Sequence, residues 1–224
     1  MTDLWEGLVR AFQLILSGDP TVYQTTLLSL FISGTATIIA TLWGTPIAMF
    51  LGLRDFRGKF VVKGFFNALI GIPTVALGLI LYLVLSKSGP LGFLRLMYTP
   101  TAVIIGEALL VTPVIVSFAT TAIEAVDPEI TSLAKTLGAS ESQASLAVLK
   151  EAANGIFIAC ITSFNRAIAE LGIALLVGGN IVLTTKIANE INFDISLSIA
   201  LTIILLAVVL VINVAAHILR RKRK

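Results

Sequence analysis

The stretch TAVIIGEALLVTPVIVSFATTAIEA, from Thr101 to Ala125, decides the fold class of this chain. It is apolar almost throughout, and Glu107 is its only charged residue before Glu124. A helix of about 20 apolar residues crosses the ~30 Å hydrocarbon core of a bilayer. The run is continuous rather than alternating, which is untypical of a membrane β-strand. The stretch therefore predicts a helical membrane span.

The composition of the whole chain agrees with a membrane protein. Of 224 residues, 57% are hydrophobic and only 13% are charged, whereas soluble chains carry about 25% charged residues. A soluble enzyme, a disordered chain and a secreted disulfide module are excluded on this ground. The single cysteine, Cys160, allows no intramolecular disulfide and no thiolate metal cluster. The single histidine, His217, is too few for a haem-anchoring subunit.

Four further apolar stretches predict spans, at 25–53, 61–85, 155–177 and 195–219. Residues 1–20 are different, because Leu4, Trp5, Leu8, Phe12, Ile15 and Leu16 share one helical face. This pattern predicts a helix lying in the membrane interface. The expected fold is an all-α membrane protein with about five transmembrane helices, forming one transmembrane domain over 1–224.

Lysines and arginines outside the spans predict the orientation. Residues 54–63, 126–154 and 220–224 carry eleven of them and would share one side of a five-span protein. The opposite side carries four, which are Arg10, Lys87, Arg95 and Lys186. Positive loops stay cytoplasmic. We expect a multi-pass protein of the cell membrane with its N-terminus outside and its C-terminus inside.

The segment 126–154 is the one long polar stretch between spans. Asp127-Pro128-Glu129 is a helix-start signal, and Gly138 is placed to end that short helix. Ser140 and Gln143 have the spacing of a capping box for a second helix. The pattern predicts a helix, a glycine corner and a helix on the cytoplasmic side. Such a corner can present a helix to a partner, or it can be an interfacial pair that only connects spans.

This segment resembles the cytoplasmic EAA loop of ABC importer permeases. The likeness lies in Leu133-Ala134-Lys135-Thr136-Leu137-Gly138-Ala139-Ser140 and in Val148-Leu149. Ser132 stands where the family has Glu, and Lys150 where it has Pro. The resemblance implies a coupling helix that docks on an ATPase subunit. The implied ATPase-coupling residues are Ser132, Leu133, Ala134, Lys135, Thr136, Leu137, Gly138, Ala139 and Ser140.

A second stretch narrows the resemblance. Phe164-Asn165-Arg166-Ala167-Ile168-Ala169-Glu170-Leu171-Gly172, followed by Leu176-Val177-Gly178-Gly179-Asn180-Ile181, is similar to permeases for tungstate and related oxyanions. Molybdate, sulfate and phosphate permeases share part of this pattern. The resemblance implies a subunit of an ATP-driven importer that works by alternating access. Permeases for sulfate, phosphate or an amino acid, and a stand-alone secondary transporter, remain alternatives.

The resemblance also implies the partners. These are two ABC ATPase subunits and an extracytoplasmic solute-binding protein, which would dock on residues 86–99 and 178–194. Five helices are too few to enclose a gated path, so a second copy of the chain is expected, with the path on the two-fold axis. Membrane lipid would surround the assembly. No cofactor is expected in this chain, because it has no phosphate-binding loop and ATP with Mg would belong to the ATPase. No feature predicts catalysis or nucleic-acid binding.

Three charged residues fall inside predicted spans. A charge there is energetically unfavourable unless it has a partner or a function. They are Glu107, Arg166 and Glu170, the last two spaced by four and so expected on one helical face. One interpretation is an ion pair, of Arg166 with Glu170 or with Glu107, that pins helices together. The other is a lining for the route of a dianion. Asn165 and Gly172 accompany them as candidate path or gate residues, although asparagines such as Asn165 and Asn213 are also typical of interhelical hydrogen bonds.

Overall fold

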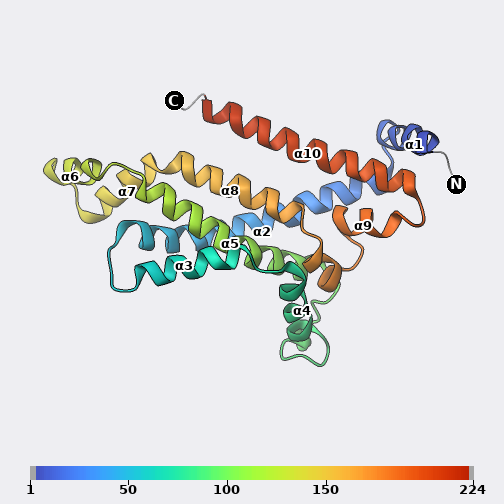
Figure 1. The fold of residues 1–224 in the computed structure, drawn as a ribbon, viewed down its shortest axis with the longest axis horizontal. Helices are drawn as coiled ribbons and strands as arrows, with labels where there is room; N and C mark the ends of the chain where they lie inside the picture. Colours follow the sequence, from blue (N-terminus) through green and yellow to red (C-terminus); the bar gives the residue numbers. More distant parts are fainter. Residues whose placement is uncertain (1–3, 222–224) are drawn as a thin grey trace.

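The computed structural model describes residues 4–221, which contain no β-strand (Figure 1). The elements in chain order are α1 (Leu4–Leu16), α2 (Pro20–Leu53), α3 (Lys59–Ile70), α4 (Thr74–Leu85), the 3₁₀ turn η1 (Gly92–Leu94), α5 (Pro100–Glu124), α6 (Pro128–Thr136), α7 (Glu141–Glu151), α8 (Ala153–Ile168), the π-helical turn η2 (Ala174–Gly178), α9 (Leu183–Glu190) and α10 (Ile195–Arg221). The prediction of an all-α membrane fold is confirmed.

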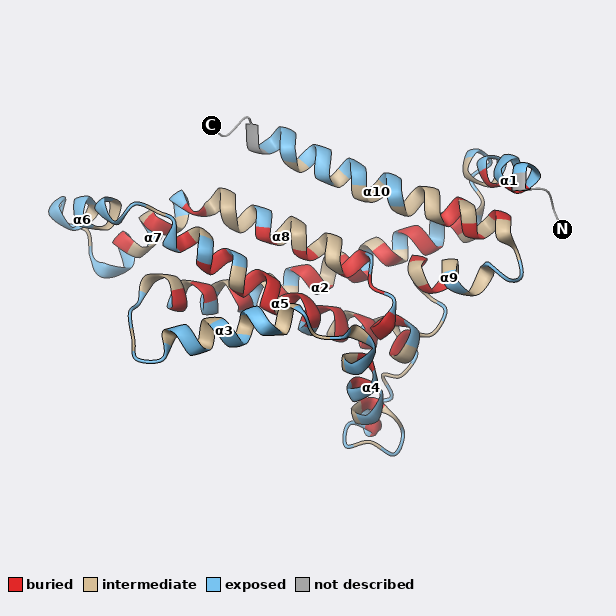
Figure 2. Cartoon of the chain, in the orientation of Figure 1, coloured by how far each residue is buried: buried red, intermediate tan, exposed pale blue. Residues whose placement is uncertain are grey.

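α5 is the centre of the bundle. It packs along α2 and also contacts α3, α8, α4 and η2. Small residues allow the close approach of α2, since a Cβ at Gly44 would come within 2.9 Å of Ile115. Figure 2 shows the buried residues gathered on α5 and on the part of α2 beside it, whereas α10 is largely exposed. An apolar helix with this much exposed surface is suited to lipid rather than water.

Within the described residues, three helices are long and apolar enough to cross a membrane, namely α2, α5 and α10. They match the predicted spans 25–53, 101–125 and 195–219. The other two predicted spans are helical too, but each belongs to a bent pair, α3 with α4 and α7 with α8. Five spans result if each bent pair counts as one.

The predicted span 61–85 is present as a sharply bent pair of helices. α3 ends at Ile70, and α4 starts at Thr74 with its axis turned by 94°. Pro73 is the physical cause, because it has no N–H to donate and its ring excludes the helical carbonyl four residues earlier. α3 runs beside α5, whereas α4 points away from the bundle (Figure 1).

The predicted span 155–177 also ends earlier than expected. α8 stops at Ile168, and the chain re-forms only one π-helical turn at η2. Two side chains hold the chain out of the helix here. The Ile173 N–H donates to Glu170 Oε1 at 3.1 Å, and Thr184 Oγ1 donates to the Glu170 carbonyl at 2.6 Å. These bonds replace the helical ladder.

The predicted N-terminal helix is present as α1, and it packs on α10. Ala11 is fully buried there, while Trp5, Phe12 and Leu16 are exposed. Its placement in the membrane interface stays a prediction. Of the basic tail, Lys222 to Lys224 lie outside the described residues, as do the side chains of Arg220 and Arg221.

Candidate functional site

Arg166 and Glu170 form an ion pair inside the bundle. Arg166 lies in the last turn of α8, and Glu170 lies just beyond the helix end. The Arg166 guanidinium donates through Nη1 to Glu170 Oε2 at 2.9 Å. The Glu170 side chain is 2% exposed and that of Arg166 is 37% exposed. The predicted pair therefore forms, with the carboxylate buried and the guanidinium open on one side.

Glu107 lies near this pair without joining it. It is buried in α5, and its partner is the Ser33 side chain of α2, which hydrogen-bonds to it. Its Oε2 atom has no hydrogen-bond partner among the residues that the structure describes. Of the two predicted pairings of Arg166, the structure has the one with Glu170.

Glu170 also holds three elements together. Besides accepting from Arg166 on α8, its carboxylate accepts from the Ile173 N–H just before η2, and its backbone carbonyl accepts from the Thr184 hydroxyl on α9. Both carboxylate oxygens are therefore occupied, which a buried carboxylate requires. Sequence reasoning did not single out Ser33, and it assigned no role in the site to Thr184. The one signal for them was a hydroxyl residue in or beside an apolar run, and such residues are too common in membrane helices to be selective.

The two remaining path candidates have structural neighbours. The Asn165 amide donates to Asn213 Oδ1 of α10 at 3.0 Å, as expected of an interhelical hydrogen bond. Gly172 touches the start of α4, where an added Cβ would lie 2.7 Å from Thr74 Oγ1 and 2.9 Å from the Val75 nitrogen. Gly172 therefore permits α4 to pack directly on the chain that carries Glu170.

The segment 126–154 has the predicted helix–corner–helix form. Asp127 caps α6 by accepting from the Glu129 N–H at 2.9 Å, with Pro128 as the first helical residue. Gly138 follows the helix with a φ of +87°, a left-handed conformation that favours glycine. Ser140 and Gln143 form the predicted capping box of α7.

The predicted coupling residues lie on the exposed part of this segment. No residue of α6 is buried, and the helix projects from one end of the bundle (Figures 1 and 2). Leu133 is 61% exposed and Leu137 is 79% exposed. Ser132, Thr136 and Gly138 are exposed, and Ala134 and Ala139 are half-buried. Two large apolar side chains on an uncovered polar helix are typical of a docking surface.

One ion pair closes the corner between the two helices. Lys135 Nζ lies 2.6 Å from Glu141 Oε1, and both side chains are largely exposed. The hydrogen bond from Lys135 holds the pKa of the Glu141 carboxyl below its usual range. Glu141 also lies in the first turn of α7, where a negative charge is favoured by the helix dipole.

The family of the chain follows from a match over most of its length. Residues 44–224 match the family model of binding-protein-dependent transport system inner membrane components. The chain belongs to this family. It is thus an ABC permease, as its helical segment 126–154 and the stretch 164–181 suggested.

Individual relatives point the same way. The chain is 41% identical to the tungstate uptake system permease protein TupB of Peptoclostridium acidaminophilum, over 82% of each chain. It is 40% identical to a probable anion ABC transporter permease protein of Haloferax volcanii, over 71% of this chain and 68% of that one. The TupB protein of Campylobacter jejuni is 30% identical, over 84% of this chain and 81% of that one.

Solved structures share the fold. A chain of the MetNI methionine ABC transporter, in inward-facing conformations, has a TM-score of 0.76 at 15% identity. The match covers 92% of this chain and 99% of that one. A chain of an amino acid ABC transporter has a TM-score of 0.70 at 19% identity, over 94% and 98%. At these identities the likeness concerns the fold alone.

Proposed function

We propose that this chain is the permease subunit of an ATP-driven importer for tungstate or a closely related oxyanion. Coupling to an ATPase is supported by the exposed helix α6, which projects from the bundle and leaves Leu133 and Leu137 uncovered. The substrate class rests on the similarity to two tungstate uptake permeases and a probable anion permease. A stand-alone secondary transporter would have no use for an exposed coupling helix.

Two copies of the chain would enclose the path, each with one ATPase subunit docked on residues 132–140. The ATPase subunits would bind ATP and Mg, and this chain would catalyse nothing. A solute-binding protein would deliver the oxyanion on the outer side, at residues 86–99 and 178–194. The distribution of basic loops supports an N-terminus outside and a C-terminus inside, with lipid around α1 and α10.

The transport cycle would be alternating access. ATP closes the ATPase dimer, and the two α6 helices move together with it. The bundle then opens outward, because rigid helices transmit the displacement. Hydrolysis and release return the path to the inward-facing state.

Arg166 and Glu170 would act on the substrate within this cycle. The open side of the Arg166 guanidinium attracts a dianion, while Glu170 competes for the same guanidinium. This competition keeps the anion from binding too tightly, because transport requires release as well as entry. Glu107, Asn165 and Gly172 would shape the route beside them.

The deciding experiment is ATP hydrolysis by the permease–ATPase complex in proteoliposomes. The binding protein is added with tungstate, molybdate, sulfate, phosphate or an amino acid. We expect tungstate or molybdate to stimulate hydrolysis and the other solutes to leave it near its basal rate. Stimulation by an amino acid alone would contradict the oxyanion assignment. Failure to assemble with any ATPase would contradict the permease mechanism itself.

Gly138→Arg tests the coupling segment. Its Cβ would meet nothing within 4 Å, so the substitution adds backbone strain of about 1–2 kcal/mol and a bulky side chain on the docking surface. We expect uptake to be lost while the protein still inserts and purifies. Gly18→Arg is the matched control, because Gly18 also has a positive φ of +73° and open space but lies between α1 and α2. Equal uptake by the two variants would overturn the coupling role.

A further inference from the structure

α4 forms an arm that leaves the bundle sideways. It turns 94° away from α3, which runs along α5, and Figure 1 shows it extending away from the other helices. α3 has 12 residues and is about 18 Å long, which is shorter than the ~30 Å thickness of the hydrocarbon core. α4, also of 12 residues and so about 18 Å long, points away from the bundle, although Leu81 and Leu85 stay buried in a cluster with residues of η2 and α5.

The shaft of this arm is suited to an apolar environment. The sequence of α4, TVALGLILYLVL, has no charged residue and no polar face. Val75, Leu79, Ile80 and Leu83 are all exposed in the single chain. A helix that is apolar all round lies in lipid or against other protein rather than in water.

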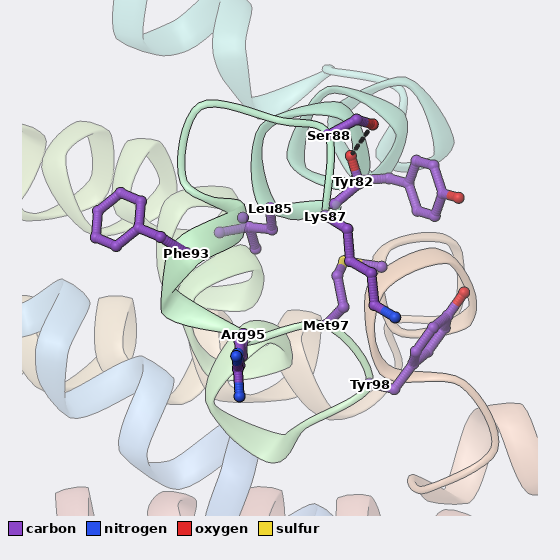
Figure 3. Close-up of a pocket in the computed structure, with 10 residues that line it drawn as sticks. Tyr82, Leu85, Lys87, Ser88, Phe93, Arg95, Met97 and Tyr98 are labelled. Carbon is purple, nitrogen blue, oxygen red and sulfur yellow. Dashed lines mark hydrogen bonds between the residues drawn. The ribbon is translucent and has the colours of Figure 1, made fainter.

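The far end of the arm has the opposite character. An open cavity of about 1020 Å³ is lined there by Tyr82, Ser86, Lys87, Ser88, Arg95 and Tyr98, among others. Figure 3 shows Lys87 reaching past Met97 toward Tyr98, with Arg95 on the other side of the loop. Neither cation makes an ion pair with any residue that the structure describes. The sequence has no Asp or Glu between Asp55 and Glu107.

Two backbone features mark the same loop. Arg95 and Tyr98 have positive φ values of 52° and 62°, and they are the only non-glycine residues with positive φ among residues 4–221. Such conformations persist where the surroundings impose them, and they are frequent at ligand sites. The conformation at Tyr98 is fixed from outside, since its N–H donates to the Val177 carbonyl at 2.7 Å.

Lipid cannot easily surround this end of the arm. Two unpaired cations and four hydroxyl groups in hydrocarbon would be strongly unfavourable. Residues 86–99 are also the segment predicted to lie on the outer side, so we expect the apolar shaft to meet lipid or protein and the polar end to face a polar space on that side. Excess positive charge with hydroxyl donors, and no carboxylate in the lining, fits an anion.

We propose that the cavity at the end of α4 is an oxyanion-binding subsite on the outer side of the bundle, with Lys87 and Arg95 as the charged ligands on its two sides. Hydroxyl groups of Ser86, Ser88, Tyr82 or Tyr98 would supply neutral donors to a tetrahedral dianion. The proposal deepens the proposed function and rests on it. The subsite would receive the anion from the binding protein before it reaches Arg166.

The arm is mechanically connected to the inner ion pair. Leu81 and Leu85 of α4 pack with Ile173 and Val177 in one buried cluster. The start of α4 touches Gly172, two residues after Glu170. A movement of the arm therefore acts directly on the chain that holds Glu170, so the two anion sites can be filled in sequence.

The test measures tungstate binding by the permease–ATPase complex in detergent without the binding protein, by equilibrium dialysis and elemental analysis at low salt. We expect Lys87→Gln and Arg95→Gln each to weaken binding by at least about tenfold, the effect of losing one charge-assisted hydrogen bond. Lys87→Arg should restore most of the affinity. Arg57→Gln is the matched control, since it removes one exposed cation that also has no ion pair among the described residues but lies in the loop between α2 and α3, and it should leave binding unchanged.

A labelling experiment tests the location of the cavity. Ser88→Cys, in a Cys160→Ala background, is placed in proteoliposomes and treated with a water-soluble maleimide. We expect the thiol to react, and tungstate to protect it from reaction. A thiol that never reacts would place the end of the arm in lipid, and a reactive thiol without protection would mean that no anion binds there. Either result overturns the proposal.

Two further outcomes would overturn it while the importer assignment stands. The first is a wild-type complex that transports tungstate but binds none without the binding protein. The second is that Lys87→Gln leaves tungstate binding intact and weakens association with the binding protein, measured by pull-down. That result would make the loop a protein-docking surface. If phosphate and sulfate protect Ser88→Cys as well as tungstate does, the subsite recognises tetrahedral dianions as a class, as proposed.

Discussion

The segment 126–154 and the region around Glu170 are built on opposite principles. α6 has no buried residue, and its shape comes from its own caps, Asp127 before it and Gly138 after it. Glu170 is buried, and its surroundings come from α8, η2 and α9 together. The first region is made by neighbours in sequence and the second by neighbours in space.

The difference predicts how substitutions in each region affect stability and transport. A locally built, uncovered helix contributes little to the stability of the bundle, so its exposed residues are available for a partner. A buried carboxylate with every oxygen engaged is part of the bundle's own structure, and a substitution there disturbs the fold as well as any transport role. Stability and transport should therefore separate in 126–154 and move together near Glu170.

Arg166→Met should have the largest effect on stability. It leaves Glu170 buried without its counter-charge, and breaking such a pair costs about 3–5 kcal/mol. We expect the lower part of this range, because the Arg166 side chain is 37% exposed. Thermal unfolding in detergent and tungstate uptake in proteoliposomes measure the two consequences.

The double variant Arg166→Met with Glu170→Met separates a structural pair from a path-lining pair. Apolar replacement of both partners is often neutral or stabilising, so we expect stability to recover in part. The recovery is limited because Glu170 also binds the Ile173 N–H. Uptake should stay low if Arg166 meets the anion. A double variant with normal uptake would reduce the pair to a structural role.

The same contrast explains what could be predicted from sequence. The caps of α6 and α7 are local signals, so the helix ends at Asp127, Gly138 and Ser140 could be predicted correctly from the sequence. The end of α8 at Ile168 could not be predicted, because Thr184, fourteen residues from Glu170, is one of its causes. A proline such as Pro73 is a local signal for a helix break, but no local signal gives the size of the bend or the direction of α4. The pairing of Arg166 with Glu170 followed from their spacing, whereas the Ser33 partner of Glu107 did not.

Gly172→Ala should have the next largest effect, again on stability and transport together. The new Cβ would lie 2.7 Å from Thr74 Oγ1 and 2.9 Å from the Val75 nitrogen, so α4 must shift away from the Glu170 segment. Overpacking of this kind costs about 1–3 kcal/mol, which should lower the melting temperature by about 2–10 °C. Gly34→Ala is a matched control, since its Cβ meets nothing within 4 Å. Equal melting temperatures for the two variants would contradict the tight contact.

Ser140→Ala should have a smaller effect, confined to the corner between α6 and α7. It removes the side chain that accepts from the Gln143 N–H at 3.3 Å, and loss of an N-cap costs about 1 kcal/mol of local helix stability. We expect faster hydrogen exchange at the start of α7 with no change in the melting temperature of the bundle. Ser140→Asp keeps an acceptor at the cap and should preserve slow exchange. A lowered melting temperature for Ser140→Ala would show that the segment is part of the cooperative core after all.

The smallest expected effect is the pH response of the same corner. Lys135 holds the pKa of Glu141 below its usual range, so the pair contributes fully above about pH 4.3, the ordinary glutamate value. Its contribution falls as the pH drops through the lowered pKa of the folded protein, because protonation removes the acceptor charge. We therefore expect hydrogen exchange at residues 137–143, corrected for its intrinsic pH dependence, to accelerate only when the pH falls below about 4.3. Glu141→Gln should exchange as the acidified wild type does at every pH. If exchange in Glu141→Gln still accelerates at acidic pH, a group other than Glu141 titrates there. The corner would then be stabilised by interactions other than the Lys135–Glu141 pair and the helix caps.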